Sequence, residues 1–328
     1  MVKIGDQTER NGRERREDQE ETKESKAIQI DADRNNTTQN ETRKRDATQT
    51  ASDWKDRTIK EKLSQLEKYF QKIALKDVCL AFSGGVDSSL LLRVAVNEAA
   101  RTGKKVYAVT FDSRLHPSCD LEIARQVVRE IGGIHQIIRI DELEQEEIRT
   151  NPQNRCYQCK RLLFERLKSF AETKGISVIL DGTNEDDLHV YRPGIQALRE
   201  LGILSPLAEL HITKNQVKEM AAFYGISVAA RPSTPCMATR IPYGQKLDYE
   251  ILAKIAEGEA HLRSKIGGNI RLRLHGNIIR LEVDCEEFLQ VLKIRGEIVG
   301  YMRNLGFDYV TLDLEGFRSG SMDLHIVS

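Results

Sequence analysis

The sequence predicts an α/β fold in which a parallel sheet carries helices on both faces, and a small α+β domain follows. Four short apolar runs alternate with amphipathic runs along the first part of the chain. The expected strands are Val78–Phe82, Val106–Phe111, Ile134–Ile140 and Val178–Leu180. Continuous apolar strands that alternate with helices are typical of parallel sheets buried on both faces. Ligands of such folds bind at the carboxyl ends of the strands.

Helices are expected before and between these strands. A first helix is predicted by apolar residues at spacings of three and four, namely Ile59, Leu63, Leu66, Phe70 and Ile73. Amphipathic runs at Leu121–Ile131 and Cys156–Ala171 predict two further helices.

The chain changes character around Pro232 and Pro235, two prolines in a short polar stretch that marks a boundary loop. Beyond it, the expected elements are a helix at Asp248–Ile266, strands at Ile270–Leu274 and Ile278–Val283, a helix at Phe288–Met302 and a strand at Tyr309–Leu314. The predicted domains are therefore residues 57–232, with the parallel sheet, and residues 233–328, with a small α+β fold.

Residues 1–56 are dense in charged and amide side chains, and Trp54 is their one aromatic residue. Such a segment cannot bury enough apolar surface to offset the entropy lost on ordering. We expect a disordered tail here.

The 328 residues carry 50 Lys and Arg against 50 Asp and Glu, so the formal net charge is zero. A neutral chain argues against nucleic acid as a partner. No apolar run reaches the roughly 18 residues of a membrane span, and no apolar signal segment opens the chain. Six cysteines in a long chain without a secretion signal indicate a reducing compartment, so we expect a cytoplasmic protein.

A glycine-rich turn follows the first predicted strand and precedes a helical run. It consists of Ser83, Gly84, Gly85, Val86, Asp87 and Ser88. The glycines let the backbone turn sharply and approach a ligand. Free amides and the positive end of the helix dipole then face one point, where phosphate is the natural occupant. The serine hydroxyls can donate hydrogen bonds, and Asp87 can hold Mg²⁺.

This turn is not a Walker P-loop, because no G-x-x-x-x-G-K-[ST] occurs in the chain. The pattern S-G-G-x-D-S resembles instead the PP-loop of the ATP pyrophosphatase superfamily. That resemblance implies ATP as cofactor, cleaved into AMP and pyrophosphate, with AMP left on a carboxylate or carbonyl. Asp112 and Ser113 follow the second strand at the same sheet edge, and we expect them to contact the nucleotide.

Cys156 and Cys159 open a predicted helix beside Arg155, Lys160 and Arg161. A helix N-terminus and neighbouring cations lower the pKa of a thiol. Two thiolates three residues apart can share a metal or a cluster, although C-x-x-C alone is half a site. Two incidental cysteines near a helix end are the alternative.

Cys236 lies in a loop close to Arg240, which favours thiolate character. Taken alone, a small buried thiol without chemistry is the better interpretation. No role is assigned to Cys79, Cys119 and Cys285.

Arg271 and Arg273 alternate along one predicted strand and therefore share a face. Two forked guanidiniums on one face suit a phosphate, and a solvated strand face is the alternative.

From about Leu75 to its end, the chain resembles the LarE family, PP-loop sulfur transferases of nickel-pincer nucleotide biosynthesis. The resemblance is carried by motifs within Ser83–Ser88, Asn151–Lys160, Asp181–Asp187, Tyr191–Gly194, Ser205–Leu207, Lys214, Pro235–Gly244, Gly306–Leu314 and Gly320–Met322. Thr239 stands where the family has serine, and it retains the hydroxyl.

The resemblance implies that ATP adenylylates a carboxylate of pyridinium-3,5-biscarboxylic acid mononucleotide and that a sulfur nucleophile displaces AMP. A thiocarboxylate results, and repetition converts the second carboxylate. The chemistry agrees, since a carboxylate is a poor electrophile and adenylylation supplies a leaving group. Mg²⁺ and the glycine-rich turn would stabilise the departing pyrophosphate. Arg271 and Arg273 would bind the phosphate of the pyridinium mononucleotide.

The family contains two sources of sulfur. In one, the cysteine that matches Cys236 gives up its own sulfur and becomes dehydroalanine. In the other, the cysteines matching Cys156, Cys159 and Cys236 hold a 4Fe–4S cluster whose open iron carries an extra sulfide. All three cysteines are present, which favours the cluster.

Other functions remain open at this point. A tRNA-thiolating PP-loop enzyme should show a basic surface, which the neutral charge does not favour. An amide-forming synthetase of the NAD, GMP or asparagine type would need a source of ammonia, and a nucleotide-binding regulator would leave the cysteines unexplained. We further expect a small-molecule nucleotide substrate, a homo-oligomer and transient contact with other cofactor-biosynthesis enzymes.

Overall fold

The computed structural model describes residues 57–231 and 234–322, and those from residue 62 onward belong to one compact unit. The predicted tail, residues 1–56, lies outside the described residues. Residues 232 and 233, where the sequence predicts a domain boundary, also lie outside them, so the division into domains stays a prediction. No helix in the described ranges has the length and apolar character that crossing a membrane requires.

A four-stranded sheet forms the centre of the first part of the chain. Its strands are β1 (Val78–Ala81), β2 (Val106–Ser113), β3 (Ile134–Ile140) and β4 (Val178–Leu180), in the order β3-β2-β1-β4. Every neighbouring pair is parallel, which confirms the predicted α/β fold.

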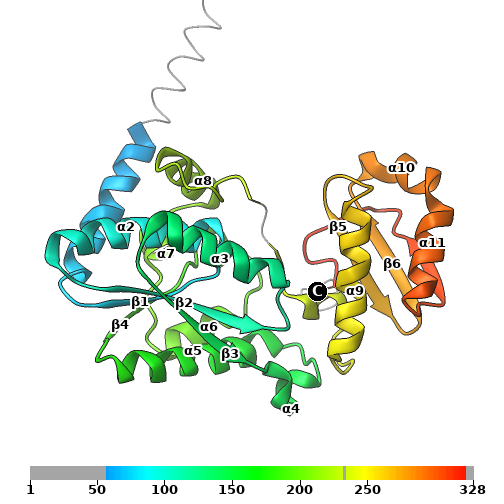
Figure 1. Ribbon diagram of the computed structural model, residues 1–328, viewed down its shortest axis with the longest axis horizontal. Helices are drawn as coiled ribbons and strands as arrows, with labels where there is room; N and C mark the ends of the chain where they lie inside the picture. Colours follow the sequence, from blue (N-terminus) through cyan, green and yellow to red (C-terminus); the bar gives the residue numbers. More distant parts are fainter. Residues whose placement is uncertain (1–56, 232–233, 323–328) are drawn as a thin grey trace, which may run out of the picture. The chain divides into compact units, whose positions relative to one another are not determined.

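Helices cover both faces of this sheet. α2 (Val86–Thr102) and α3 (Ser118–Ile131) lie on one face, and α5 (Arg155–Thr173) and α6 (Gly194–Glu200) lie on the other (Figure 1). Phe164 and Leu167 of α5 pack with Cys79 and Val109 in one apolar cluster. Burial on both faces is the reason that β1 reads as a continuous apolar run, whereas the edge strand β3 is partly exposed along its length.

The strand order decides where the site lies. The chain runs outward from β1 to β2 and β3, and then returns to β4 on the other side of β1. In open α/β sheets, ligands bind in the crevice at such a switch point, at the carboxyl ends of the strands. The Ser83–Ser88 turn begins two residues beyond the last residue of β1 and leads into α2.

Shorter elements complete this part of the chain. A helix of residues 57–73 precedes β1, as the sequence predicts. The others are η1 (Glu142–Glu144), α4 (Glu146–Arg149), η2 (Glu185–His189), α7 (Pro206–Glu209), α8 (Lys214–Phe223) and η3 (Met237–Arg240).

The C-terminal part contains a second sheet of three strands, in the order β5-β6-β7. β5 (Ile270–His275) and β6 (Ile278–Val283) are antiparallel, and β7 (Tyr309–Leu312) runs parallel to β6. α9 (Tyr249–Arg263) precedes the sheet. The crossover from β6 to β7 consists of η4 (Cys285–Glu287), α10 (Phe288–Lys293) and α11 (Arg295–Asn304).

The single helix predicted over residues 288–302 is two helices. The chain leaves helical geometry at Ile294, where φ is −103° and ψ is 16°. This turn lets Val291 of α10 and both Ile298 and Met302 of α11 join one apolar core. Packing against the sheet therefore overrides the local helical pattern.

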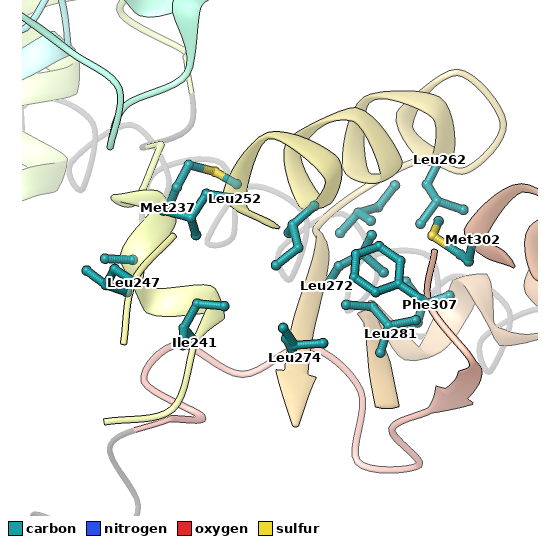
Figure 2. Packing of buried hydrophobic residues seen from close by; sticks show 14 of the residues in the cluster. Met237, Ile241, Leu247, Leu252, Leu262, Leu272, Leu274, Leu281, Met302 and Phe307 are labelled. Atoms are coloured by element: carbon teal, nitrogen blue, oxygen red, sulfur yellow. The ribbon is translucent and has the colours of Figure 1, made fainter. Parts of the chain in front are cut away.

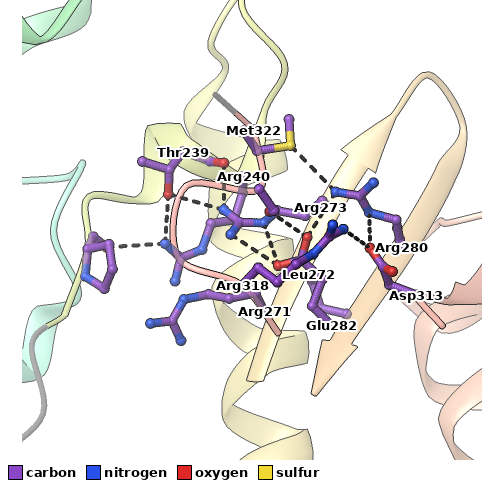
Figure 3. A network of polar contacts seen from close by, with 12 residues as sticks. Thr239, Arg240, Arg271, Leu272, Arg273, Arg280, Glu282, Asp313, Arg318 and Met322 are labelled. Carbon is purple, nitrogen blue, oxygen red and sulfur yellow. Dashed lines mark hydrogen bonds and ion pairs between the residues drawn. The ribbon is translucent and has the colours of Figure 1, made fainter. Parts of the chain in front are cut away.

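The two faces of the second sheet differ in chemistry because side chains alternate along each strand. Leu272 of β5 and Leu281 of β6 pack with Met302 in the apolar core (Figure 2). The alternate residues, including Arg273 and Glu282, form a polar network (Figure 3). The predicted α+β character of this part is confirmed.

Gly84→Ala is expected to destabilise the protein more than Gly103→Ala. Both glycines have a positive φ, 71° and 68°, so both substitutions strain the backbone. A Cβ at Gly84 would lie 2.9 Å from backbone atoms of Ala124 in α3, whereas a Cβ at Gly103 meets open space. We expect the first variant to lose about 2 kcal/mol more of the free energy of unfolding. Urea denaturation measures this, and equal losses would contradict the close approach.

Candidate active site

The turn after β1 has the backbone of an anion-binding loop. Gly84 adopts φ 71°, a left-handed conformation that favours glycine. Gly85 then caps α2 with extended backbone, so the first amides of the helix have no acceptor within it. The hydroxyls of Ser83 and Ser88 lie 3.3 Å apart, and Val86 is buried beneath the turn. These donors and the positive end of the helix dipole favour a phosphate.

Asp87, the expected magnesium ligand, is held by two donors. Its carboxylate accepts hydrogen bonds from the Lys214 ammonium and, at 3.1 Å, from the Asn184 amide. Lys214 is the first residue of α8, and Asn184 is the N-cap of η2, so three segments meet at the turn. A Mg²⁺ ion takes carboxylate oxygens in preference to other donors and would compete with the ammonium for Asp87.

A second carboxylate, Asp187, lies beside this pair. Asn184 and Asp187 form a capping box, with hydrogen bonds of 3.2 and 3.3 Å between side chains and backbone amides. Arg192 forms an ion pair with Asp187 at 2.9 Å. Burial raises the pKa of Asp187, and Arg192 acts in the opposite direction. Two carboxylates and two cations thus form a polar centre, as a magnesium nucleotide requires.

Asp112 and Ser113, expected at the nucleotide, end β2 with different partners. Asp112 faces Arg139 of β3 in an exposed ion pair at 3.5 Å. The Ser113 hydroxyl donates to Glu142 at 2.5 Å and accepts the N–H of Leu115 at 3.1 Å. Contact of Asp112 and Ser113 with a nucleotide stays a prediction.

Glu142 connects the end of β2 with the predicted sulfur site. It is fully buried, and its Oε2 has no hydrogen-bond partner among the described residues. Burial raises the pKa of this carboxyl, and the hydrogen bond from Ser113 lowers it. Glu142 also acts electrostatically on Cys159 and Cys236, so the three groups are neighbours.

The structure brings the three cysteines close to one another, and Cys156 and Cys236 lie close to Arg155. The Sγ atom of Cys156 lies 3.6 Å from a guanidinium nitrogen of Arg155. Cys156 and Cys236 both act electrostatically on Arg155, and both act on Cys159. Tertiary structure thereby joins a C-x-x-C pair with a cysteine far along the chain.

Asn151 ties the segment after Cys236 to the start of α5. It is fully buried with φ 55°, and its amide donates to the carbonyls of Ile241 and Pro242 at 3.2 and 2.8 Å. Its side-chain oxygen accepts from Arg155, which also donates to the carbonyl of Ala238 at 3.3 Å. Buried polar groups that are fully satisfied hold such segments rigidly.

A buried ion pair fixes the other side of the Cys236 loop. Arg240, in η3, donates two hydrogen bonds of 2.9 Å to Glu259 of α9, and both side chains are 1% exposed. Arg240 also donates to the carbonyls of Pro235 and Cys236, at 3.2 and 3.3 Å. A bidentate pair of this kind sets geometry as well as energy.

The three thiols fit an iron–sulfur cluster in the chemistry of their donors. Burial raises the pKa of both Cys236 and Cys159, and Arg155 lowers the pKa of Cys236. In residues 57–231 and 234–322, no three His, Cys, Asp or Glu side chains are arranged to hold a single metal ion. Cluster ligands attach to different iron atoms, so this finding concerns a compact single-ion site.

Arg271 and Arg273 share a face of β5, but their partners differ (Figure 3). Arg273 pairs with Glu282 at 3.1 Å and donates to the carbonyl of Thr239 at 2.8 Å. Arg271 forms no ion pair with the described residues, and burial together with nearby Arg240 lowers its pKa to about 10. The phosphate-binding role of both arginines stays a prediction.

No sequence pattern predicts a role for Glu142, and Lys214 stands out only as part of the family resemblance. The pattern from Thr213 to Gln216 is a capping box, so the sequence does place Lys214 at a helix start. Lys214 and Asp87 are far apart in the sequence, so no local pattern predicts that they form an ion pair. Glu142 stands among several acidic residues, and no pattern distinguishes the one that becomes buried.

Comparisons with known proteins agree with this fold. A family model described as a PP-loop domain matches residues 57–190. An uncharacterized protein of Synechocystis sp. is 37% identical over 267 residues, which cover 81% of this chain and 98% of that protein. The pyridinium-3,5-bisthiocarboxylic acid mononucleotide synthase of Lactiplantibacillus plantarum is 34% identical over 253 residues, 76% of this chain and 91% of the enzyme.

The fold, the glycine-rich turn and the matching model define a PP-loop protein, a class of ATP-utilising enzymes. The two relatives align over nearly their whole length, and the chain belongs to the LarE family. An uncharacterized protein of Methanocaldococcus jannaschii is also similar, at 31% identity over 249 residues, 76% of this chain and 94% of that protein.

Glu142→Gln should remove a loss of stability at high pH. Burial raises the pKa of Glu142 in the folded protein above its unfolded value. The folded state therefore holds this proton more tightly, and stability falls as the pH rises from the unfolded towards the folded pKa. Glutamine can accept the Ser113 hydrogen bond and does not ionise. The variant should gain stability over the wild type at about pH 8 and lose that gain towards about pH 4.

The matched control is Glu144→Gln, which changes an exposed carboxylate in the same turn. It should leave the pH dependence unaltered. Thermal unfolding followed by circular dichroism at both pH values gives the comparison. An effect of Glu142→Gln that is equal at both pH values would contradict the raised pKa.

Proposed function

We propose that the protein is an ATP-dependent sulfur transferase that converts the carboxylates of pyridinium-3,5-biscarboxylic acid mononucleotide to thiocarboxylates. The observation that carries this proposal is the proximity of Cys156, Cys159 and Cys236 to one another in a PP-loop fold. The name of the L. plantarum relative supplies the class of product. Three clustered thiols favour sulfur transfer over amide formation, which needs none.

Adenylylation of a carboxylate is the first proposed step. The amides of the Ser83–Ser88 turn would hold the phosphates of ATP, and Asp87 would hold Mg²⁺. Lys214 pairs with Asp87 and is therefore near enough to the turn to neutralise phosphate charge as Mg²⁺ takes its place. Asp112 and Ser113 would border the nucleotide at the end of β2.

The substrate's own phosphate is assigned to Arg271 and Arg273. Arg271 forms no ion pair with the described residues, and Glu282 holds Arg273 in place. Arg273 donates to the carbonyl of Thr239, three residues after Cys236. A phosphate bound here would therefore place the substrate near the Cys236 loop.

Two sources of sulfur are compatible with the three cysteines. In one, Cys236 gives up its own sulfur and becomes dehydroalanine. In the other, Cys156, Cys159 and Cys236 hold a 4Fe–4S cluster, which would supply sulfide at an iron that no cysteine binds. The proximity of all three thiols to one another supports the second. A homo-oligomeric state and transient contact with other cofactor-biosynthesis enzymes stay predictions.

Turnover with the pyridinium substrate should release AMP and pyrophosphate. Asp87→Asn keeps the shape of the side chain and removes its charge, and it should slow turnover by about 100-fold with little change in melting temperature. Chromatography of the nucleotides and a pyrophosphate assay measure both outcomes. Asp308→Asn, the same change at an exposed carboxylate of the C-terminal part, is the control. Substrate-dependent release of ADP and orthophosphate would exclude the proposal.

Single Cys→Ala variants decide the sulfur source. After anaerobic reconstitution, the wild type should hold about four iron and four sulfide ions, and Cys156→Ala, Cys159→Ala and Cys236→Ala should each lose them. Cys285→Ala, at an exposed cysteine outside the site, should retain them. Full activity of the Cys156 and Cys159 variants, with dehydroalanine at position 236 after turnover, would establish the sacrificial route instead.

A further inference from the structure

The buried cation of the sulfur site has no ion pair with a carboxylate of the described residues. Arg155 is 3% exposed, and its hydrogen bonds within residues 57–231 and 234–322 go to other kinds of groups. Its Nη1 donates to neutral oxygens of Asn151 and Ala238, and its Nη2 faces the sulfur of Cys156. A buried charge without a counter-ion is far more costly than a buried neutral group.

Other buried arginines of the protein show the contrast. Arg240 binds Glu259, and Arg273 binds Glu282, each through close ion pairs. Arg271 also forms no ion pair with any residue that the structure describes, and it lies on the sheet face assigned above to the substrate's phosphate. Arg155 differs from Arg271 in that its guanidinium lies next to a thiol, that of Cys156.

Sulfur is the nearest source of negative charge among the groups that hydrogen-bond to the Arg155 guanidinium within the described residues, because the Sγ atom of Cys156 lies 3.6 Å from Nη2. Cys236 and Tyr243 also act on its charge, and the ring centroid of Tyr243 lies 5.4 Å from the guanidinium carbon. The nearby carboxyl of Glu142 acts on the thiols and is bound by Ser113.

We infer that Arg155 is the fixed counter-charge of the sulfur site, a positioning residue whose guanidinium holds the negatively charged sulfur that passes to the activated carboxylate. The inference rests on the proposed function and adds a residue to it. Asn151 and Ala238 fix the plane of the guanidinium through Nη1, so Nη2 is held towards Cys156. The anion bound here is a small sulfur species, either a thiolate of the site or a sulfide brought to it.

The test compares two alkylating reagents on the full chain without added metal. Iodoacetate is negatively charged and iodoacetamide is neutral, and both react with the thiolate. The ratio of their rates at one cysteine therefore cancels the thiolate fraction and reports how strongly the site attracts an anion. Peptide mass spectrometry gives this ratio for each cysteine. Cys285, exposed and outside the site, is the internal reference.

In the wild type, the iodoacetate-to-iodoacetamide ratio at Cys156 should exceed that at Cys285 by about fivefold. Arg155→Met, which removes the charge at similar length, should abolish this excess. Arg155→Lys should retain at least half of it. Arg161→Met, at an exposed arginine of the same helix that pairs with Glu165, is the matched control and should change nothing.

A wild-type ratio at Cys156 no higher than at Cys285 overturns the inference, and this result needs no variant to fold. An unchanged ratio in Arg155→Met, or equal losses in the Met and Lys variants, overturns it as well. Failure of the proposed function is read separately, because the alkylation ratio needs neither ATP nor the pyridinium substrate. If the iodoacetate-to-iodoacetamide ratio at Cys156 is raised but the protein transfers no sulfur, the role of Arg155 as counter-charge stands and the proposed function is excluded.

Discussion

The hydrogen-bonded unit of Asn151 and Arg155 is the constraint on which the candidate site depends. Arg155 donates hydrogen bonds to Asn151, to the sulfur of Cys156 and to the carbonyl of Ala238. The amide of Asn151 donates to the carbonyls of Ile241 and Pro242. The start of α5 and the Cys236 loop therefore cannot separate without leaving a guanidinium and an amide buried and unpaired. Because that penalty is large, the two segments behave as one piece. The Arg240–Glu259 pair holds the same loop from its other side.

The two ends of the site use charge in different ways. At the glycine-rich turn, each carboxylate already has a cation, Lys214 for Asp87 and Arg192 for Asp187, and these side chains are partly exposed. Partly exposed pairs are weak, so incoming Mg²⁺ and phosphate can exchange with them at low cost. Near the thiols, the cation is Arg155, which is buried and held in place by hydrogen bonds to Asn151 and Ala238. We regard this difference as suited to the proposed reaction, in which nucleotide comes and goes while the sulfur site stays assembled.

Local patterns predicted much of this protein. The apolar runs located β3, β4 and β6 to the residue, because strands buried on a face carry an uninterrupted or alternating apolar signal. The glycine turn was predicted from six consecutive residues, and the structure shows its left-handed glycine and its helix start. The prediction of one helix over residues 288–302 was wrong. The break at Ile294 allows both helices to pack against the sheet, and Gly296, two residues later, is the one local residue that disfavours a helix there.

The sequence by itself determined the class of fold, the phosphate turn and the three cysteines, since each is written in consecutive residues or in a short period. Only the tertiary structure decided which distant groups meet. It paired Lys214 with Asp87 and Arg273 with Glu282, and it buried Glu142 near the thiols. Among the described residues, it left Arg155 without an ion pair to a carboxylate. Such partners depend on the order of the strands and on which of several similar side chains becomes buried. No short sequence pattern indicates either of these features.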